Sequence, residues 1–212
     1  MIAGLLINAW SFFLLFIVIM VGCLYEFFRI VKKISPKRYL YYLPLGLIYI
    51  VLPVLLMLSM GIEFRIYTIG TLTHEWIFTP LIPCAIIFSI WINDTMAYIV
   101  GSLIGKNSLS KISPNKTWEG TIGGAILCVT VITLLSLIIP RASALTWQQW
   151  MHIAGISAIT GTLGDLLESK LKRTAGIKDS GSFMPGHGGF LDRFDSLLVA
   201  VPFVWLYVYL FV

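Results

Sequence analysis

Six apolar runs, each about as long as a bilayer is thick, constrain this 212-residue chain more than any other feature. A transmembrane helix takes about 20 apolar residues, and the runs cover roughly 3–28, 39–61, 79–104, 118–140, 148–171 and 189–212. None of them alternates apolar and polar residues as membrane β-barrel strands do. Hydrophobic residues make up 58% of the chain and charged residues 12%, against about 45–50% and 25% in soluble domains. The sequence therefore predicts an all-α, polytopic membrane bundle of about six helices, with a single domain over residues 1–212.

The basic residues predict how this bundle is oriented. Thirteen of the 15 Lys and Arg residues lie in or beside the first, third and fifth connections, and only Arg65 and Arg141 lie in the other two. The positive-inside rule assigns the basic connections to the cytosol, so both termini are expected on the non-cytosolic side of the cell (inner) membrane. The first run has no basic segment before it and is too long for a cleavable signal peptide. The formal charge of +5 is then a topology signal, and no nucleic-acid partner is expected.

A charged segment near the C-terminus is the main candidate for a functional site. The chain has 25 charged residues, 15 basic and 10 acidic, and ten of these 25 lie in the segment from Asp165 to Asp195. A charged side chain at the centre of a membrane helix costs about 2.5–3.5 kcal/mol on insertion scales, so such residues usually mark function. Glu168, Lys170 and Arg173 fit a plainer interpretation, in which charges at the end of a helix point into water.

Asp165 has no such explanation, because it follows an uncharged stretch and needs a partner. Asp192 and Asp195 lie just inside the start of the last helix. Acidic groups at similar depth repel unless a cation lies between them, and oxygen ligands suit Mg²⁺. We expect Asp165 and Asp192 to bind Mg²⁺, with Mn²⁺ as an alternative and room for a second cation. For any one aspartate, a salt bridge to Arg173 or Arg193 is the competing interpretation.

The turn PGHGG at 185–189 precedes the last helix. Glycines let backbone N–H groups approach a ligand, and a helix N-terminus favours anions. Beside Lys178 and Arg193 this turn predicts a phosphate cradle, although most glycine-rich loops are only turns. His187 could act as a base, but a turn histidine more often forms local hydrogen bonds.

Polar residues also interrupt the third run and open the fourth. Asp94 lies about 15 Å from the inner end of its predicted helix, and such a residue normally faces a polar cavity. Thr117 is the predicted N-cap of the fourth helix, with Glu119 in its first turn. We expect a cytosol-facing funnel bounded by the third, fifth and sixth helices, with residues 91–212 as the catalytic part and 1–90 as supporting spans.

Three segments closely resemble the phosphatidate cytidylyltransferase (CDP-diacylglycerol synthase) family. From Ser169 to Asp195 the chain reads S-K-L-K-R-x4-K-D-x-G-x-x-M-P-x-H-G-G-F-L-D-R-F-D, which matches the family's signature at nearly every fixed position. N-D-T-x-A-Y from Asn93 and S-P-x-K-T-W-E-G from Ser113 are similar to the family as well. Met96 and Met184 depart from the usual residues, and many relatives carry extra N-terminal spans.

The resemblance implies the reaction of CTP with phosphatidate to give CDP-diacylglycerol and pyrophosphate, and a homodimer in a lipid bilayer. It implies that Asp165 and Asp192 hold the divalent metal. The resemblance also implies that the phosphates are neutralised by four basic residues, Lys172, Arg173, Lys178 and Arg193. It implies that the site is completed by Ser169, Asp179, His187, Gly188, Gly189 and Asp195. Its far wall would be lined by Asp94, Lys116 and Thr117.

Two other functions remain open on the sequence. A CTP-dependent polyprenol or phytol kinase would share the bilayer and the CTP site but transfer the γ-phosphate and release CDP. An ion-coupled transporter could use Asp94, Asp165 and Asp192 as a relay, although transporters often show internal repeats and this chain has none. A purely structural scaffold would have no need of so many charges in one segment.

Overall fold

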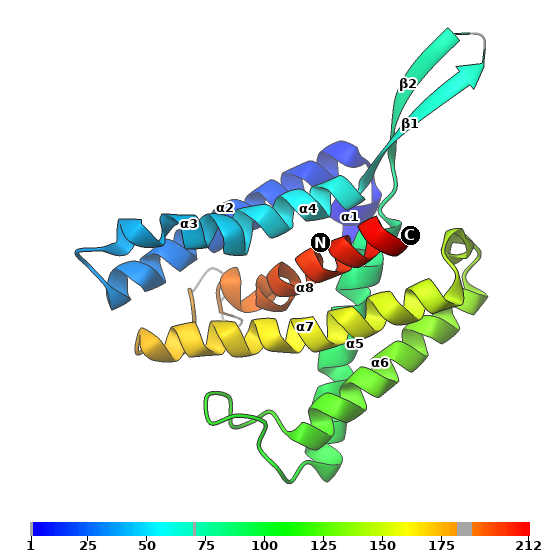
Figure 1. The fold of residues 1–212 in the computed structure, drawn as a ribbon. Helices are drawn as coiled ribbons and strands as arrows, with labels where there is room; N and C mark the ends of the chain where they lie inside the picture. Colours follow the sequence, from blue (N-terminus) through cyan, green and yellow to red (C-terminus); the bar gives the residue numbers. More distant parts are fainter. Residues whose placement is uncertain (1, 70, 182–187) are drawn as a thin grey trace.

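The computed structural model describes residues 2–69, 71–181 and 188–212, and it shows a bundle of long helices with a hairpin projecting from one end (Figure 1). The elements in chain order are α1 (Ile2–Leu6), α2 (Ala9–Ile34), η1 (Tyr39–Tyr42), α3 (Leu43–Gly46), η2 (Leu47–Val51), α4 (Leu52–Met60), β1 (Ile62–Ile69), β2 (Thr71–Phe78), α5 (Leu81–Ile104), α6 (Trp118–Ile138), η3 (Pro140–Ala144), α7 (Trp147–Thr174) and α8 (Leu191–Phe211).

The membrane class predicted from the apolar runs is confirmed. Among the described residues, five helical stretches are long and apolar enough to cross a membrane, and they are Ala9–Ile34, Tyr39–Met60, Leu81–Ile104, Trp118–Ile138 and Leu191–Phe211. The remaining predicted run, 148–171, forms α7, which has 28 residues. Glycine, serine, threonine and charged residues lower its hydropathy, and it is not among the five. A count of six spans and the orientation of the termini therefore stay predictions.

The first apolar run begins later than its hydropathy suggests, because Asn8 separates α1 from α2. The Asn8 side chain accepts a hydrogen bond from the Ser11 N–H at 2.8 Å, and the Ser11 hydroxyl accepts one from the Asn8 N–H at 3.2 Å. This reciprocal capping satisfies two backbone donors that a helix start would leave unpaired. From there α2 continues to Ile34, so the helix ends about two turns beyond the predicted run.

The mostly helical class is confirmed, but residues 62–78, for which the sequence predicts only a connection, depart from it. These residues form a two-stranded antiparallel hairpin, in which Ile62 pairs with Phe78 and the register continues to Ile69 and Thr71. The segment is rich in Ile, Thr, Tyr, Phe and Trp, which pack well on a pleated surface. The hairpin lies outside the helical bundle (Figure 1).

Close helix contacts set the positions of α5, α6, α7 and α8. A Cβ atom added at Gly124 of α6 would lie 2.7 Å from the Ala97 Cα of α5, and one at Gly164 of α7 would lie 2.9 Å from the Ser196 Cα of α8. Small residues let membrane helices approach this closely. Gly155 makes no comparably close contact, because the nearest atom to an added Cβ is a Val129 methyl group at 3.8 Å.

Gly124→Ala and Gly155→Ala are a matched pair that tests this packing. Both changes gain about 1 kcal/mol of helix propensity, but only the alanine at position 124 collides with a neighbouring backbone, and overpacking costs about 1–3 kcal/mol. We expect Gly124→Ala to lower the thermal midpoint in detergent by several degrees and Gly155→Ala to keep or raise it. Size-exclusion chromatography after a heating series measures both midpoints, and equal midpoints would contradict the assignment of this contact.

Candidate functional site

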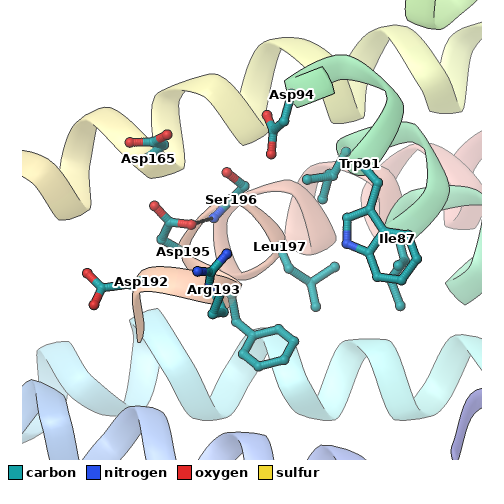
Figure 2. A pocket seen from close by; sticks show the side chains of 11 residues that line it. Ile87, Trp91, Asp94, Asp165, Asp192, Arg193, Asp195, Ser196 and Leu197 are labelled. Carbon is teal, nitrogen blue, oxygen red and sulfur yellow. Dashed lines mark hydrogen bonds between the residues drawn. The ribbon is translucent and has the colours of Figure 1, made fainter. Parts of the chain in front are cut away.

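A cavity of about 370 Å³ lies between α5, α7 and α8, the three helices that the sequence predicts around a polar funnel. Its polar lining consists of Asp94 from α5, Asp165 from α7, and Asp192, Arg193, Asp195 and Ser196 from α8, and its apolar lining includes Ile87, Trp91 and Leu197. Figure 2 shows the four aspartates grouped on one side of this space and the apolar side chains on the other. Asp165 and Asp192, the predicted metal ligands, thus face the same cavity.

A second cavity of about 490 Å³ adjoins the first, because Asp94 and Asp165 line both. Its other walls come from α5, α6 and the connection between them, with Ser113, Lys116 and Thr117 among the lining residues. The motif at Asn93, the motif at Ser113 and the charged segment therefore meet in space.

The connection at 105–117 is held in shape by the start of α6. The Thr117 hydroxyl accepts a hydrogen bond from the Gly120 N–H at 3.1 Å, which confirms the predicted N-cap. The Glu119 carboxylate accepts the N–H groups of Lys106 and Asn107 at 3.2 Å each and the Asn107 side-chain amide at 2.6 Å. These bonds fix the base of the connection that carries Lys116.

Lys116 is the ion-pair partner of Asp165. The other oxygen of this carboxylate accepts the Ser169 hydroxyl at 3.3 Å. The competing interpretation pairs an aspartate with Arg173 or Arg193. At Asp165 the structure instead shows an ion pair with a lysine more than 40 residues away in sequence. Sequence spacing could not reveal this pair, because only the fold brings the connection against α7.

Lys172 holds two carboxylates together at the end of α7. Its Nζ lies 2.6 Å from Glu168 Oε2 and 2.7 Å from Asp192 Oδ1. The Glu168 side chain is 1% exposed, so the expectation that it points into water is wrong. Lys170 and Arg173 are exposed, as predicted. A single ammonium group thus joins α7 to α8.

The second oxygen of Asp192 is occupied by the protein backbone. Asp192 Oδ2 accepts the N–H groups of Ser180 at 2.9 Å and Gly189 at 2.8 Å. Gly188 has a φ of 82°, and a Cβ atom there would lie 2.6 Å from the same oxygen. In this structure the N–H of Gly189 therefore binds Asp192, whereas the sequence predicts that it lines a phosphate cradle.

The charges around the cavity do not balance. Among the described residues, five carboxylates line the cavity or pair beside it, those of Asp94, Asp165, Glu168, Asp192 and Asp195, against three basic groups, those of Lys116, Lys172 and Arg193. Asp195 is 7% exposed and accepts the Ser196 N–H at 2.7 Å. Uncompensated charge is costly in a low-dielectric interior, and such a surplus is relieved either by protonation of a carboxylate or by a bound cation.

The donor set fits a magnesium-type ion only in part. Within the described residues, no three His, Cys, Asp or Glu side chains are grouped closely enough to hold a metal by themselves. Mg²⁺ is usually held by one or two carboxylates, with waters and substrate phosphates completing its shell. Two carboxylates facing one cavity are consistent with that arrangement.

Several predicted site residues lie apart from the cavities. The side chains of Arg173, Lys178 and Asp179 are exposed and line neither of the two cavities. His187 lies outside the described residues. The roles that the resemblance implies for these four residues stay predictions.

Sequence reasoning missed Glu26, which it placed within a purely supporting segment. This α2 residue is 3% exposed, and its carboxylate accepts hydrogen bonds from Ser180 and Leu191, on either side of the glycine-rich turn. One signal could have identified it, because Glu26 is the only charged residue among the first 28 and an isolated charge in a membrane helix points to function.

Fold and site together define a multi-helix membrane protein with an acidic cavity between its helices, two of whose aspartates form ion pairs with lysines. Residues 46–211 match the model of the cytidylyltransferase family, and the chain belongs to that family.

Two relatives illustrate the similarity. The chain is 46% identical over 114 residues to a phosphatidate cytidylyltransferase of Staphylococcus saprophyticus, which is 53% of this chain and 43% of that protein. It is 43% identical over 123 residues to a phosphatidate cytidylyltransferase of Bacillus subtilis, which is 58% of this chain and 45% of that protein. The matched part spans less than half the length of each relative, and the family resemblance drawn from the motifs is confirmed.

Lys172→Met and Lys170→Met test how far the ammonium group stabilises the end of α7. Removing one partner of a fully buried ion pair costs about 3–5 kcal/mol; the partly exposed Lys172 should cost less, about 1–3 kcal/mol. The exposed Lys170 should cost under about 0.5 kcal/mol, as surface changes usually do. Unfolding of both variants in mixed micelles with increasing SDS measures the difference. Equal unfolding midpoints would mean that the lysine bridge carries little stability.

Proposed function

We propose that this chain transfers the cytidylyl group of CTP to phosphatidate, giving CDP-diacylglycerol and pyrophosphate, in a cavity that opens to the cytosol. The observation that carries the proposal is the grouping of four aspartates from three helices around one space (Figure 2). Lys116 and Lys172 form ion pairs with two of these aspartates, Asp165 and Asp192. Membership of the cytidylyltransferase family supports the type of chemistry, and the names of the two relatives support the lipid acceptor.

In this proposal Asp165 and Asp192 would hold Mg²⁺, with Mn²⁺ as the alternative, and Asp94 and Asp195 leave room for a second cation. The surplus of carboxylates over basic groups supports this assignment. When bound, the ion would supply positive charge to the triphosphate and to the pyrophosphate leaving group.

The basic groups of the chain would bind the two phosphate-bearing substrates. Lys116 and Lys172 neutralise Asp165 and Asp192 in this structure, and each is a flexible point charge that can turn from a carboxylate to a phosphate. Arg193 lines the cavity itself. Fixed charges aimed at the reacting phosphate would stabilise the negative charge that develops there.

The reaction needs no protein base. A phosphate monoester has a second pKa near 6 and is mostly dianionic at neutral pH, so a phosphatidate oxygen can attack the α-phosphorus of CTP directly. The new P–O bond forms in line with the breaking bond between the α-phosphorus and the bridging oxygen, and pyrophosphate leaves. Orientation and electrostatic stabilisation would supply most of the rate. His187 is then not required as a base.

The setting of the reaction is part of the same proposal. Two of the three helices that line the cavity, α5 and α8, are long and apolar enough to cross a bilayer, so a lipid head group could reach it from the membrane while CTP enters from the cytosol. We place the protein in the cell (inner) membrane as a homodimer, as the family resemblance implies. Cross-linking of the protein in membranes tests the dimer.

Purified protein incubated with phosphatidate and CTP labelled at the α-phosphate provides the direct test. We expect label in the lipid fraction, release of pyrophosphate, and loss of both on addition of EDTA. A kinase would instead leave the α-label in released CDP and would label the lipid only from CTP labelled at the γ-phosphate. That outcome, or undiminished turnover in EDTA, would contradict the proposal.

Asp165→Asn and Asp192→Asn test the two proposed cation ligands. Each change keeps the size of the side chain but removes a negative charge, and we expect initial rates at least about 100-fold below wild type, since one preorganised electrostatic group is worth about 10²–10³-fold. Glu63→Gln, in the β1 strand outside the bundle, is the control and should leave the rate unchanged. Normal elution on size-exclusion chromatography shows that the variants are folded. Wild-type rates in both asparagine variants would remove the assignment.

A further inference from the structure

Glu26 is an acidic residue buried in an apolar helix. It lies eight residues before the end of α2 at Ile34, which corresponds to about 12 Å along the helix axis. Its carboxylate is 3% exposed and lies outside the part of the chain that matches the family model. Burying a carboxylate is expensive unless hydrogen bonds compensate it, so its partners indicate what it does.

Two of these partners belong to the charged segment. Glu26 Oε2 accepts the Leu191 N–H at 2.9 Å and lies 2.6 Å from the Ser180 hydroxyl oxygen. Leu191 is the first residue of α8, and its N-cap residue, Phe190, makes no side-chain capping bond. Glu26 therefore caps α8 from another helix, where a negative charge also interacts favourably with the helix dipole.

The two glycines that flank residues 182–188 are close to the same carboxylate. A Cβ atom added at Gly181 would overlap Glu26 Oε1, and one at Gly189 would overlap both carboxylate oxygens. At Gly181 the three nearest atoms all belong to the Glu26 side chain. Both ends of the glycine-rich turn thus approach Glu26 more closely than any other residue type would allow.

Ser180 connects Glu26 to the proposed cation ligand. Its hydroxyl oxygen lies 2.6 Å from Glu26 Oε2 and 2.9 Å from Asp192 Oδ2, so its single hydrogen can go to either carboxylate. Asp192 Oδ2 also accepts the backbone N–H groups of Ser180 and Gly189. The backbone that orients Asp192 is therefore the backbone that Glu26 holds.

We propose that Glu26 is a positioning residue, which fixes both ends of the 181–189 turn and the start of α8 so that Asp192 faces the cavity. The role in catalysis rests on the proposed function, whereas the role in holding the backbone does not. The N-terminal helices then complete the site instead of only supporting it.

The first experiment measures hydrogen exchange in detergent micelles, with Glu26→Ala, Glu26→Gln and the control Tyr25→Phe. Tyr25 directly precedes Glu26 in α2, and its side chain is exposed. In Glu26→Ala we expect exchange in peptides that contain Gly189 and Leu191 to be at least about 10-fold faster, with little change in peptides from α6. Glu26→Gln keeps one acceptor oxygen and should recover part of the protection, and Tyr25→Phe should behave as wild type. Wild-type exchange at Leu191 in Glu26→Ala would overturn the proposal.

The second experiment uses Mn²⁺ as a spectroscopic probe of the cation ligands. Loss of a group that orients a metal ligand typically costs about 10–100-fold in metal affinity or activity. We expect Glu26→Ala to weaken Mn²⁺ binding, measured by electron paramagnetic resonance, by at least about 10-fold and to lower kcat more than it raises KM for CTP. Unchanged Mn²⁺ affinity together with unchanged kcat would overturn the positioning role.

A double-mutant cycle tests the steric contact with Gly181. Gly181→Ala should displace the carboxylate and reproduce the exchange and rate defects of Glu26→Ala without removing the acid. In the Glu26→Ala background the same methyl group no longer meets the carboxylate, so the double variant should be no worse than Glu26→Ala alone, which is the non-additivity expected of residues in contact. Additive losses would contradict the contact. If Glu26→Ala does not fold, Gly181→Ala and Glu26→Gln carry the test by the same readouts.

The two proposals fail in different ways. If the wild-type protein makes no CDP-diacylglycerol but Leu191 exchanges faster in Glu26→Ala, the proposed function is wrong and the backbone role of Glu26 stands. If the wild-type protein is active and Glu26→Ala matches it in exchange, Mn²⁺ affinity and rate, the positioning role is wrong and the function stands.

Discussion

Neutralisation of the Asp192 carboxylate is the interaction on which the rest of the site depends. Oδ1 binds the Lys172 ammonium of α7, and Oδ2 binds the backbone N–H groups of Ser180 and Gly189. A half-buried charge at the start of a helix cannot keep all its water, so these partners must come from the protein. Satisfying one carboxylate therefore fixes the end of α7, the start of α8 and the flanks of the turn between them.

The same physical requirement assembles the opposite wall. Asp165 needs a cation, and Lys116 supplies it from a connection that Glu119 and the Thr117 cap hold in shape. Both carboxylates are thus paired with lysine, a compact point charge that shifts partners more readily than the planar arginine fork. A site neutralised by lysines can exchange those partners for a cation and for phosphate groups without rebuilding its helices.

The sequence was a sound guide wherever the cause is local. Runs of about 20 apolar residues have one stable form in a bilayer, because every backbone polar group must be satisfied within the helix, and the motifs gave the family. The sequence was a poor guide where the burial of a side chain or its pairing with a distant residue determines the structure. Glu168 is spaced i, i+4 to Lys172, a pair that can lie equally well on a wet or a dry face, and only the approach of α8 buries it. Residues 62–78 read as a connection because two short strands carry a weaker pattern than a membrane helix.

By itself the sequence determined the membrane class, the helix positions, the N-cap at Thr117 and the set of charged groups near the C-terminus. The tertiary structure alone decided which of them meet. It paired Lys116 with Asp165, left Arg173 and Lys178 exposed, and brought Glu26 to Ser180 across 154 positions of sequence. The reason is physical: hydropathy and capping act over a few residues, whereas the partner of a buried charge is chosen by whichever helix packs against it, and no spacing rule in one chain encodes that choice.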